Sequence, residues 1–364
     1  MNDLAWTDLV ASSTEHGDAF TEVSSRAISA PAPPQFVFGS IPASLNSIYY
    51  NEVIVHPVGV YTLADAGIAG DGFPIRAGQF LTAPYYCLAE SYIAAMLGNV
   101  KPATVRHESG RAICLSGPGY LIYGHWLVDI LPKLYALDLL GIDLSTETLV
   151  MPANTPGFGL DWLKLLRIQP RRVLTYHPSE EILTFDQLVL PLPFRANSRA
   201  SPLFPAAVAS LLARTGLDPA AESSVPNGRV YVSRQNSGRF GRQLENAEEV
   251  EREVRDCGYS IVYPELLSLP QQIALFRHAR FLVGEYGSAL HASMFAGPDC
   301  VVCALRGTST SPGFLQSGLC QVAGQRFGYV FGSTVEHADG TQSFRVERTA
   351  VRRALDMMNI IVAT

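Results

Sequence analysis

Residues 281–290 of this 364-residue chain read Phe-Leu-Val-Gly-Glu-Tyr-Gly-Ser-Ala-Leu. The apolar run Phe281 to Val283 predicts a buried strand, and the glycines and small residues after it predict a tight turn into a helix. Ligands of open parallel sheets bind beyond the carboxyl ends of the strands, where glycine lets backbone N–H groups approach an anion. The same turn would also allow close packing of a strand against a helix, so its role depends on the segments around it.

The segments around this stretch alternate between apolar runs and helical patterns from Arg229 onward. The runs that predict strands lie at 229–233, 259–263 and 300–305. Asn246 and Ser268 each have a Glu or Gln three residues later, a spacing that predicts a capping box at a helix start. The first of these helices ends near Gly258. This alternation indicates a Rossmann-like half with a parallel sheet.

The first half of the chain shows a similar rhythm between about residues 46 and 195. Helices are predicted at 127–140 and 160–166, and strands at 148–151 and 172–176. Two strands joined through a helix form a βαβ unit, which implies parallel pairing. We therefore predict a second α/β domain.

Composition divides the chain at a polar, irregular stretch between Phe194 and Pro205. We predict an N-terminal domain over residues 1–200, whose first 45 residues are rich in Ser, Ala and Pro and are expected to be irregular. A C-terminal domain is predicted over 201–364, with a last helix at about 351–360. A chain of this length is long for one core and suits two.

The bulk composition narrows the function classes. Apolar residues make up 48% and charged residues 16%, which predicts sizeable buried cores. The net charge of -6 argues against a protein whose main ligand is nucleic acid. The start of the chain has no signal-peptide pattern, and no apolar run is long enough to span a bilayer. We expect a cytoplasmic protein with at most peripheral membrane contact.

Six cysteines are scattered along the chain, and only Cys300 and Cys303 form a C-x-x-C pair. A zinc site would need a second ligand pair at a suitable spacing, and the sequence shows none. The pair lies in an apolar run, so we predict buried free thiols in a strand. Asp-x-Asp, Walker A, Gly-x-Ser-x-Gly and complete Gly-x-Gly-x-x-Gly motifs are also missing from the sequence.

Arginines follow the first predicted strand of the second half. Ser233 ends that strand, and Arg234, Arg239 and Arg242 come within the next nine residues. Guanidinium groups offer planar paired donors that suit a diphosphate. A solvated loop that pairs with nearby glutamates would give the same pattern, so spacing alone leaves both interpretations open.

In the first half, His125 and Asp129 are spaced i, i+4 at the start of an apolar helix, so both side chains can lie on one face. A carboxylate beside an imidazole can act as a general base toward a sugar hydroxyl. The alternative is structural, because aspartate is favoured in the first turn of any helix.

Together these segments resemble glycosyltransferase family 61, a group of β-xylosyl-, arabinosyl- and N-acetylglucosaminyl-transferase-like proteins, over roughly residues 120–305. The matching positions are His125, Trp126 and Asp129; Ser233, Arg234, Arg242, Asn246, Glu249 and Val250; Pro264, Glu265, Gln272, Ile273, Phe276 and Ala279; and Val283, Gly284, Gly287 and Leu290. The chain departs from the family pattern in the last block. The departures there are Tyr286 for a histidine, Ser288-Ala289 for Ala-Gly, and His291-Ala292 for Thr-Asn. Elsewhere Ala247 replaces the first glutamate of Asn-Glu, and the acidic residue that often ends the last strand is replaced near Cys303.

The resemblance implies a GT-B fold, with two Rossmann-like domains facing each other across a cleft. It implies inverting transfer of a hexosyl or pentosyl group from a nucleotide sugar, a UDP-sugar in particular, without a metal ion or other cofactor. The acceptor would be a saccharide or glycolipid hydroxyl in surface polysaccharide synthesis, and the oligomeric state is left open.

The resemblance also assigns site residues. Asp129 is expected to be the base and His125 to orient it or contact the acceptor. The donor-binding residues implied are Ser233, Arg234, Arg239, Arg242, Glu265, Tyr286, Gly287, Ser288, Ala289 and Leu290. The alternative is a non-catalytic nucleotide- or carbohydrate-binding relative, suggested by Tyr286, Ala289 and Ala292. A sugar epimerase is a weaker alternative, because the dinucleotide fingerprint is missing.

Overall fold

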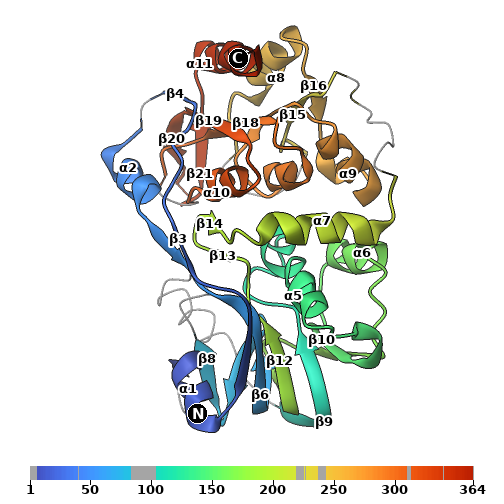
Figure 1. Cartoon of the computed structure of the whole chain (residues 1–364). Helices are drawn as coiled ribbons and strands as arrows, with labels where there is room; N and C mark the ends of the chain where they lie inside the picture. Colours follow the sequence, from blue (N-terminus) through green and yellow to red (C-terminus); the bar gives the residue numbers. More distant parts are fainter. Residues whose placement is uncertain are drawn as a thin grey trace. The chain divides into compact units, whose positions relative to one another are not determined.

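The computed structural model shows a mixed α/β protein in two compact units (Figure 1). The residues it describes are 6–39, 41–82, 104–218, 225, 227–236, 243–309, 313–338 and 340–363. Unit 1 comprises Met1–Ala27, Ile54–Ala196 and Ser201–Thr215, and unit 2 comprises Ile28–Val53, Asn197–Ala200 and Gly216–Thr364. The chain passes between the units at 27/28, 53/54, 196/197, 200/201 and 215/216, so neither unit is one continuous segment. Short strands lie near these crossings: β3 (Ala27–Ser29), β5 (Val53–Val55), β13 (Arg195–Ala196) and β14 (Arg199–Ala200).

Unit 1 is built on a nine-stranded sheet in the order β1-β8-β7-β6-β12-β9-β10-β11, with β2 also paired to β6. Its strands are β1 (Trp6–Asp8), β2 (Ala19–Ser24), β6 (Val58–Ala69), β7 (Phe73–Arg76), β8 (Gln79–Thr82), β9 (Thr104–Cys114), β10 (Thr148–Pro152), β11 (Arg172–Tyr176) and β12 (Glu181–Pro191). Strands β12, β9, β10 and β11 pair in parallel, which confirms the predicted βαβ unit. Strands β6, β7 and β8 pair antiparallel, and so do β12 and β6, which the sequence analysis did not predict.

The helices of unit 1 connect these strands. They are α1 (Leu9–His16), α4 (Tyr123–His125), the π-helical turn η2 (Trp126–Ile130), α5 (Lys133–Leu139), the 3₁₀ turn η3 (Leu144–Thr146), α6 (Gly157–Leu165) and α7 (Phe204–Thr215). The helix predicted at 127–140 is therefore an almost continuous run from 123 to 139 that contains one wide turn.

Proline explains the wide turn. Pro132 has no N–H to donate, and in a regular helix its ring would clash with the carbonyl four residues earlier. In the structure the N–H of Leu131 instead donates to the carbonyl of Trp126, five residues earlier, at 2.9 Å. This π-helical turn contains Asp129, and such turns often occur at functional sites.

Unit 2 has a six-stranded, fully parallel sheet in the order β16-β15-β17-β18-β19-β4. Its strands are β15 (Arg229–Val232), β16 (Ser260–Val262), β17 (Phe281–Glu285), β18 (Val301–Arg306), β19 (Arg326–Phe331) and β4 (Phe36–Phe38), with a separate hairpin of β20 (Ser333–Glu336) and β21 (Gln342–Arg345). From β15 the chain passes first to β16 on one side and then to β17 on the other side of β15. The strand order therefore reverses at this point, as in doubly wound folds. This confirms the parallel α/β sheet predicted for the second half.

The helices of unit 2 are α2 (Ala43–Tyr50), α8 (Ala247–Asp256), the 3₁₀ turn η4 (Pro264–Leu266), α9 (Leu269–Arg277), the 3₁₀ helix η5 (Leu290–Phe295), α10 (Leu315–Val322) and α11 (Arg348–Ala363). Helices α8 and α11 lie side by side over one face of the sheet (Figure 1). Val250 of α8 and Leu355 of α11 share a buried cluster with Val283 of β17. No helix in the described residues is both apolar and long enough for a membrane span.

Three local expectations were wrong. The described part of residues 1–45 is not irregular, because Asp8 caps α1 by accepting from the N–H of Ala11, and β4 joins the sheet of unit 2. The helix predicted after β17 is only the 3₁₀ helix η5. Asn246 makes no capping hydrogen bond, because its side chain binds the backbone of Val346 instead. The capping box at Ser268 is confirmed.

Close packing inside unit 1 gives a test of this fold. A Cβ added at Gly159 in α6 would lie 2.3 Å from the Cζ2 atom of Trp126, which is 3% exposed. We expect Gly159→Ala to lower the free energy of unfolding by about 1–3 kcal/mol, because the indole must shift in a packed core.

Gly157→Ala is the matched control, because a Cβ there meets open space on the same helix. It should be neutral or slightly stabilising, since alanine is the better helix former. Urea denaturation measures both variants, and equal midpoints for the two would contradict the packing.

Candidate active site

The imidazole of His125 and the carboxylate of Asp129 lie together in unit 1. The chain leaves β9 at Cys114, forms a loop and enters α4, which ends at His125. The Nδ1 atom of His125 lies 2.6 Å from Oδ2 of Asp129. This confirms that the i, i+4 spacing brings the two side chains to one face. Both residues follow the carboxyl end of a parallel strand, where open α/β sheets bind ligands.

Arg195 completes the pair. Its Nε atom donates to Oδ1 of Asp129 at 2.6 Å, and its Nη2 atom donates to Oδ2 at 2.7 Å. Such a bidentate pair fixes the orientation of the carboxylate as well as its charge. The sequence analysis missed Arg195, because no local spacing connects it to a residue 66 positions earlier.

The surroundings determine the protonation of Asp129. Burial alone would raise the pKa of this carboxyl, but the charge of Arg195 and the hydrogen bond from His125 outweigh burial and hold the pKa well below its usual range. Asp129 is therefore a persistent carboxylate whose two oxygens both accept strong hydrogen bonds. Such a group is a weak base, whereas it can orient an imidazole and stabilise its charged form.

The His125 ring has a defined support on one side. A Cβ built on Gly119 would lie 2.6 Å from Cγ of His125, so the glycine backbone packs directly against the imidazole. Gly119 has a φ of +83°, a conformation that glycine adopts readily. The side chain of His125 is 33% exposed. With Nδ1 directed at Asp129, Nε2 is the nitrogen that remains to exchange a proton with a ligand.

Lys133 holds the loop that carries Gly119. Lys133 is 4% exposed, and its Nζ donates to the carbonyls of Leu115 and Ser116 at 3.0 and 3.1 Å. Burial lowers the pKa of Lys133. Burial raises the pKa of nearby Asp71, and the backbone N–H of Gly119 opposes that rise. The sequence analysis identified neither Lys133 nor Asp71 as a site residue, because both act through contacts distant in sequence.

A second group of candidate residues lies in unit 2, at the carboxyl ends of β15 and β17. The strand order reverses between these two strands, which is the usual ligand-binding position of a doubly wound sheet. The Nη1 atom of Arg234 donates to the carbonyl of Tyr286 at 3.2 Å. Gly287 lies beside the same guanidinium, because a Cβ added at Gly287 would lie 3.1 Å from Nη1 of Arg234. The structure thus brings Arg234 to the turn that follows β17.

A buried carboxylate at the end of β17 anchors this arrangement. Glu285 is fully buried, and its Oε1 atom accepts from the backbone N–H of Arg234 at 3.1 Å. Its Oε2 atom accepts from the N–H of Leu244 at 3.3 Å. Burial raises the pKa of Glu285, although these hydrogen bonds oppose the shift. The sequence analysis missed this anchor, since an acidic residue in a turn gives no signal that it is buried.

The remaining predicted donor residues differ in their exposure. Ser233 and Leu290 are fully buried, and Ser233 donates from Oγ to Glu251 at 2.8 Å. Tyr286 is 5% exposed, and its hydroxyl accepts from the N–H of Leu315 at 2.8 Å. The exposed or partly exposed ones are Arg234, Glu265, Ser288 and Ala289. Arg239 and Arg242 lie outside the described residues.

The buried set therefore shapes the turn, and the exposed set can contact a ligand. Glu265 lies in η4, directly after β16. Within the described residues, no cluster of three or more His, Cys, Asp or Glu side chains could hold a metal ion. Cys300 and Cys303 are buried free thiols, as predicted.

Comparison with known proteins gives one family. The family model described as Glycosyltransferase 61 matches residues 123–303, a range that contains His125, Asp129, Arg195 and the described donor-site candidates of unit 2. No curated protein matches the chain.

Among solved structures, the chain is similar to the dodecameric iron-containing heptosyltransferase TibC, determined in complex with ADP-D-beta-D-heptose. The identity is 12%, the match covers 76% of this chain and 81% of that chain, and the TM-score is 0.27.

The Asp129 carboxylate should make stability depend on pH. Its pKa is depressed in the folded state, so its stabilising effect is present above the unfolded pKa of about 4 and is lost as the pH falls further. We expect Asp129→Asn to lower the free energy of unfolding at pH 7, and the difference from wild type to shrink below about pH 4.

Chemical denaturation between pH 3 and pH 7 measures this difference. Asp161→Asn serves as the control, because it removes an exposed carboxylate of the nearby helix α6. A difference between Asp129→Asn and wild type that stays constant down to pH 3 would contradict the ion pair.

Proposed function

Since the chain belongs to glycosyltransferase family 61 and is a glycosyltransferase, we propose that it transfers a sugar from a nucleotide donor to a hydroxyl group with inversion and without a metal ion. The observation that carries this proposal is the hydrogen-bonded series Arg195, Asp129 and His125 in unit 1. An inverting transfer needs one base beside the acceptor hydroxyl, and this series supplies one with a fixed orientation.

The geometry favours His125 as the base rather than Asp129, the reverse of the roles expected from the sequence. Both oxygens of Asp129 are engaged by Arg195 and His125, so the carboxylate has little capacity to take another proton. In our proposal Nε2 of His125 accepts the acceptor's proton as its oxygen bonds to the anomeric carbon. The bond from that carbon to the diphosphate breaks, and its electron pair leaves with the diphosphate. Asp129 stabilises the imidazolium, and Arg195 holds Asp129 in place.

The donor's diphosphate is assigned to the turn after β17. The Arg234 guanidinium and the N–H groups at Ser288 and Ala289 lie at the strand-order reversal, where they would offset the charge that develops on the leaving group. Arg239 and Arg242 remain predicted contributors to this charge. Glu265, exposed after β16, would accept hydrogen bonds from a ribose or sugar hydroxyl.

The proposal includes the GT-B arrangement, in which the two domains would face each other across a cleft. It also includes a UDP-sugar as donor, a saccharide or glycoconjugate as acceptor, and a cytoplasmic role in surface polysaccharide synthesis. The competing function is a non-catalytic relative that binds nucleotide or carbohydrate. Tyr286 favours it to a limited degree, because its hydroxyl is engaged by the backbone of Leu315 rather than directed at a ligand.

Substitution of His125 tests the base. We expect His125→Gln to lower kcat by about 10²–10⁴-fold with unchanged affinity for the donor, because only proton transfer is lost. Asp129→Asn should retain more activity than His125→Gln, because it keeps the imidazole. The measurement is UDP release from UDP-sugars in the presence of saccharide acceptors, with donor affinity from calorimetry.

His107→Gln is the control, since His107 is an exposed histidine of β9 and pairs with Asp186 instead. An inactive Asp129→Asn beside an active His125→Gln would assign the base to the carboxylate. Donor binding by wild type without any turnover would favour the non-catalytic alternative.

Substitution of Arg234 tests the donor site separately. A hydrogen bond to a charged group contributes about 1.5–3 kcal/mol, so we expect Arg234→Met to weaken UDP binding roughly 10- to 100-fold. UDP should raise the melting temperature of wild type and do so less in the variant. Arg252→Met, which removes an exposed arginine of α8, should behave as wild type. Equal UDP affinity in Arg234→Met and wild type would exclude Arg234 from the site.

A further inference from the structure

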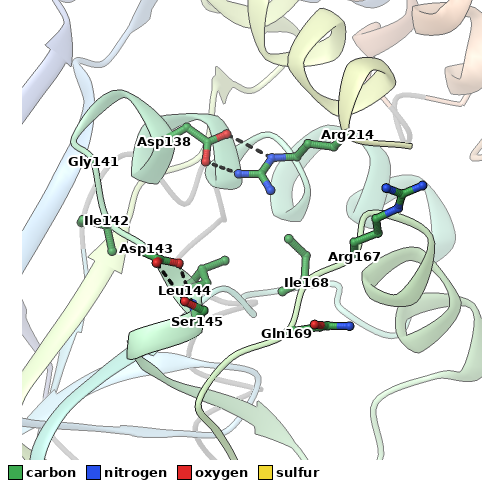
Figure 2. Close-up of a pocket in the computed structure, with 10 residues that line it drawn as sticks. All are labelled: Asp138, Gly141, Ile142, Asp143, Leu144, Ser145, Arg167, Ile168, Gln169 and Arg214. Carbon is green, nitrogen blue, oxygen red and sulfur yellow. Dashed lines mark hydrogen bonds and ion pairs between the residues drawn. The ribbon is translucent and has the colours of Figure 1, made fainter. Parts of the chain in front are cut away.

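A polar cavity of about 390 Å³ lies in unit 1. Figure 2 shows the residues that line it, and neither His125 nor Asp129 is among them. The polar side chains that line it are Asp138, Asp143, Ser145, Arg167, Gln169 and Arg214. Its volume is within the lower part of the range usual for small-molecule sites.

The cavity and the candidate base lie at opposite ends of the parallel strands. Ser145 and Gln169 precede β10 and β11 in the chain, so the cavity is at the amino ends of these parallel strands. His125 follows the carboxyl end of β9, which pairs in parallel with β10. The cavity is therefore distinct from the catalytic crevice proposed above.

The lining contains one satisfied ion pair and one free guanidinium. Arg214 donates to both carboxylate oxygens of Asp138. Its Nε atom donates to Oδ2 at 3.1 Å, and its Nη2 atom donates to Oδ1. Figure 2 shows this pair on one side of the cavity and Arg167 on another. Among the residues that the structure describes, no hydrogen bond or ion pair engages the side chain of Arg167 or Gln169. These two groups are available to a ligand.

The backbone at Arg167 supports a use for its side chain. The φ of Arg167 is +55°, and the N–H of Ile168 donates to the carbonyl of Leu163 at 2.9 Å. This is the helix ending in which glycine is strongly favoured. The chain does use glycine in this conformation after α1 and α8, at Gly17 and Gly258. At the end of α6 it has an arginine instead, at some cost in backbone energy.

We propose that this cavity binds a saccharide that carries one carboxylate, such as a uronic acid unit. Two arginines and two aspartates line the cavity, and Arg214 is paired with Asp138, so the lining suits a single negative charge at Arg167 rather than a nucleoside diphosphate. Ring hydroxyls need acceptors as well as donors. The Asp143 carboxylate, which already accepts from Ser145 at 2.8 Å, and the Gln169 amide supply both.

Methyl NMR of the full chain tests the proposal at the cavity itself. Ile142 and Ile168 line it, so their δ1-methyl signals should shift on titration with glucuronate and reach saturation. The methyl signal of Ile113, buried in β9, should stay unchanged and serves as the internal reference. Glucose, which lacks the carboxylate, should bind at least fivefold more weakly. This readout does not require sugar transfer, so it can fail or succeed independently of the proposed reaction.

Variants at the end of α6 sharpen the test. Arg167→Gln should raise the dissociation constant for glucuronate at least fivefold, and Arg171→Gln, an exposed arginine outside the cavity, should leave it unchanged. Arg167→Gly should raise the melting temperature, because glycine suits the backbone, and should lose glucuronate binding.

Three results would overturn the proposal. The first is the absence of saturable shifts at Ile142 and Ile168. The second is an unchanged glucuronate affinity in Arg167→Gln or Arg167→Gly. The third is inorganic phosphate binding as tightly as glucuronate with the same dependence on Arg167, which would make the cavity a simple anion site.

Discussion

The ion pair between Asp129 and Arg195 is the interaction on which the proposed active site depends. The side chains are 14% and 16% exposed, so leaving either charge there without the other would be costly. Their pairing joins the π-helical turn after β9 to a residue that follows β12, and it leaves His125 with a fixed partner for Nδ1. Removing either charge would thus alter the imidazole's orientation as well as the stability of unit 1.

The loop from Leu115 to Gly119 supports the other side of the His125 imidazole. Lys133 binds two of its carbonyls, and the Gly119 backbone packs against the ring. A catalytic group on a rigid support needs less reorganisation when substrate binds. His125 is therefore restrained by Asp129 at its edge and by Gly119 at its face.

Sequence patterns predicted the features that depend on neighbours in the chain. The strands predicted at 148–151, 172–176, 229–233 and 281–283, and the approach of His125 to Asp129, follow from local patterns and were confirmed. Arg195 and Glu285 were not predicted as site residues, because their partners are distant in sequence and burial changes their roles. Pro132 is a local signal that the helix is disturbed. The sequence does not tell whether the helix breaks there or continues through a π-helical turn, and the structure shows the π-helical turn.

The strand β4 has a consequence for how the protein folds. It is formed by Phe36–Phe38, yet it pairs with β19 near the other end of the chain. During synthesis this segment must therefore wait for nearly the whole chain before its hydrogen bonds can form, and contacts of such high sequence separation form slowly. A fragment made only of the second half would lack β4 and expose the unpaired edge of β19, a surface prone to aggregation. The nucleotide-binding half proposed here is thus not an autonomous folding module, because its last strand is encoded near the beginning of the chain.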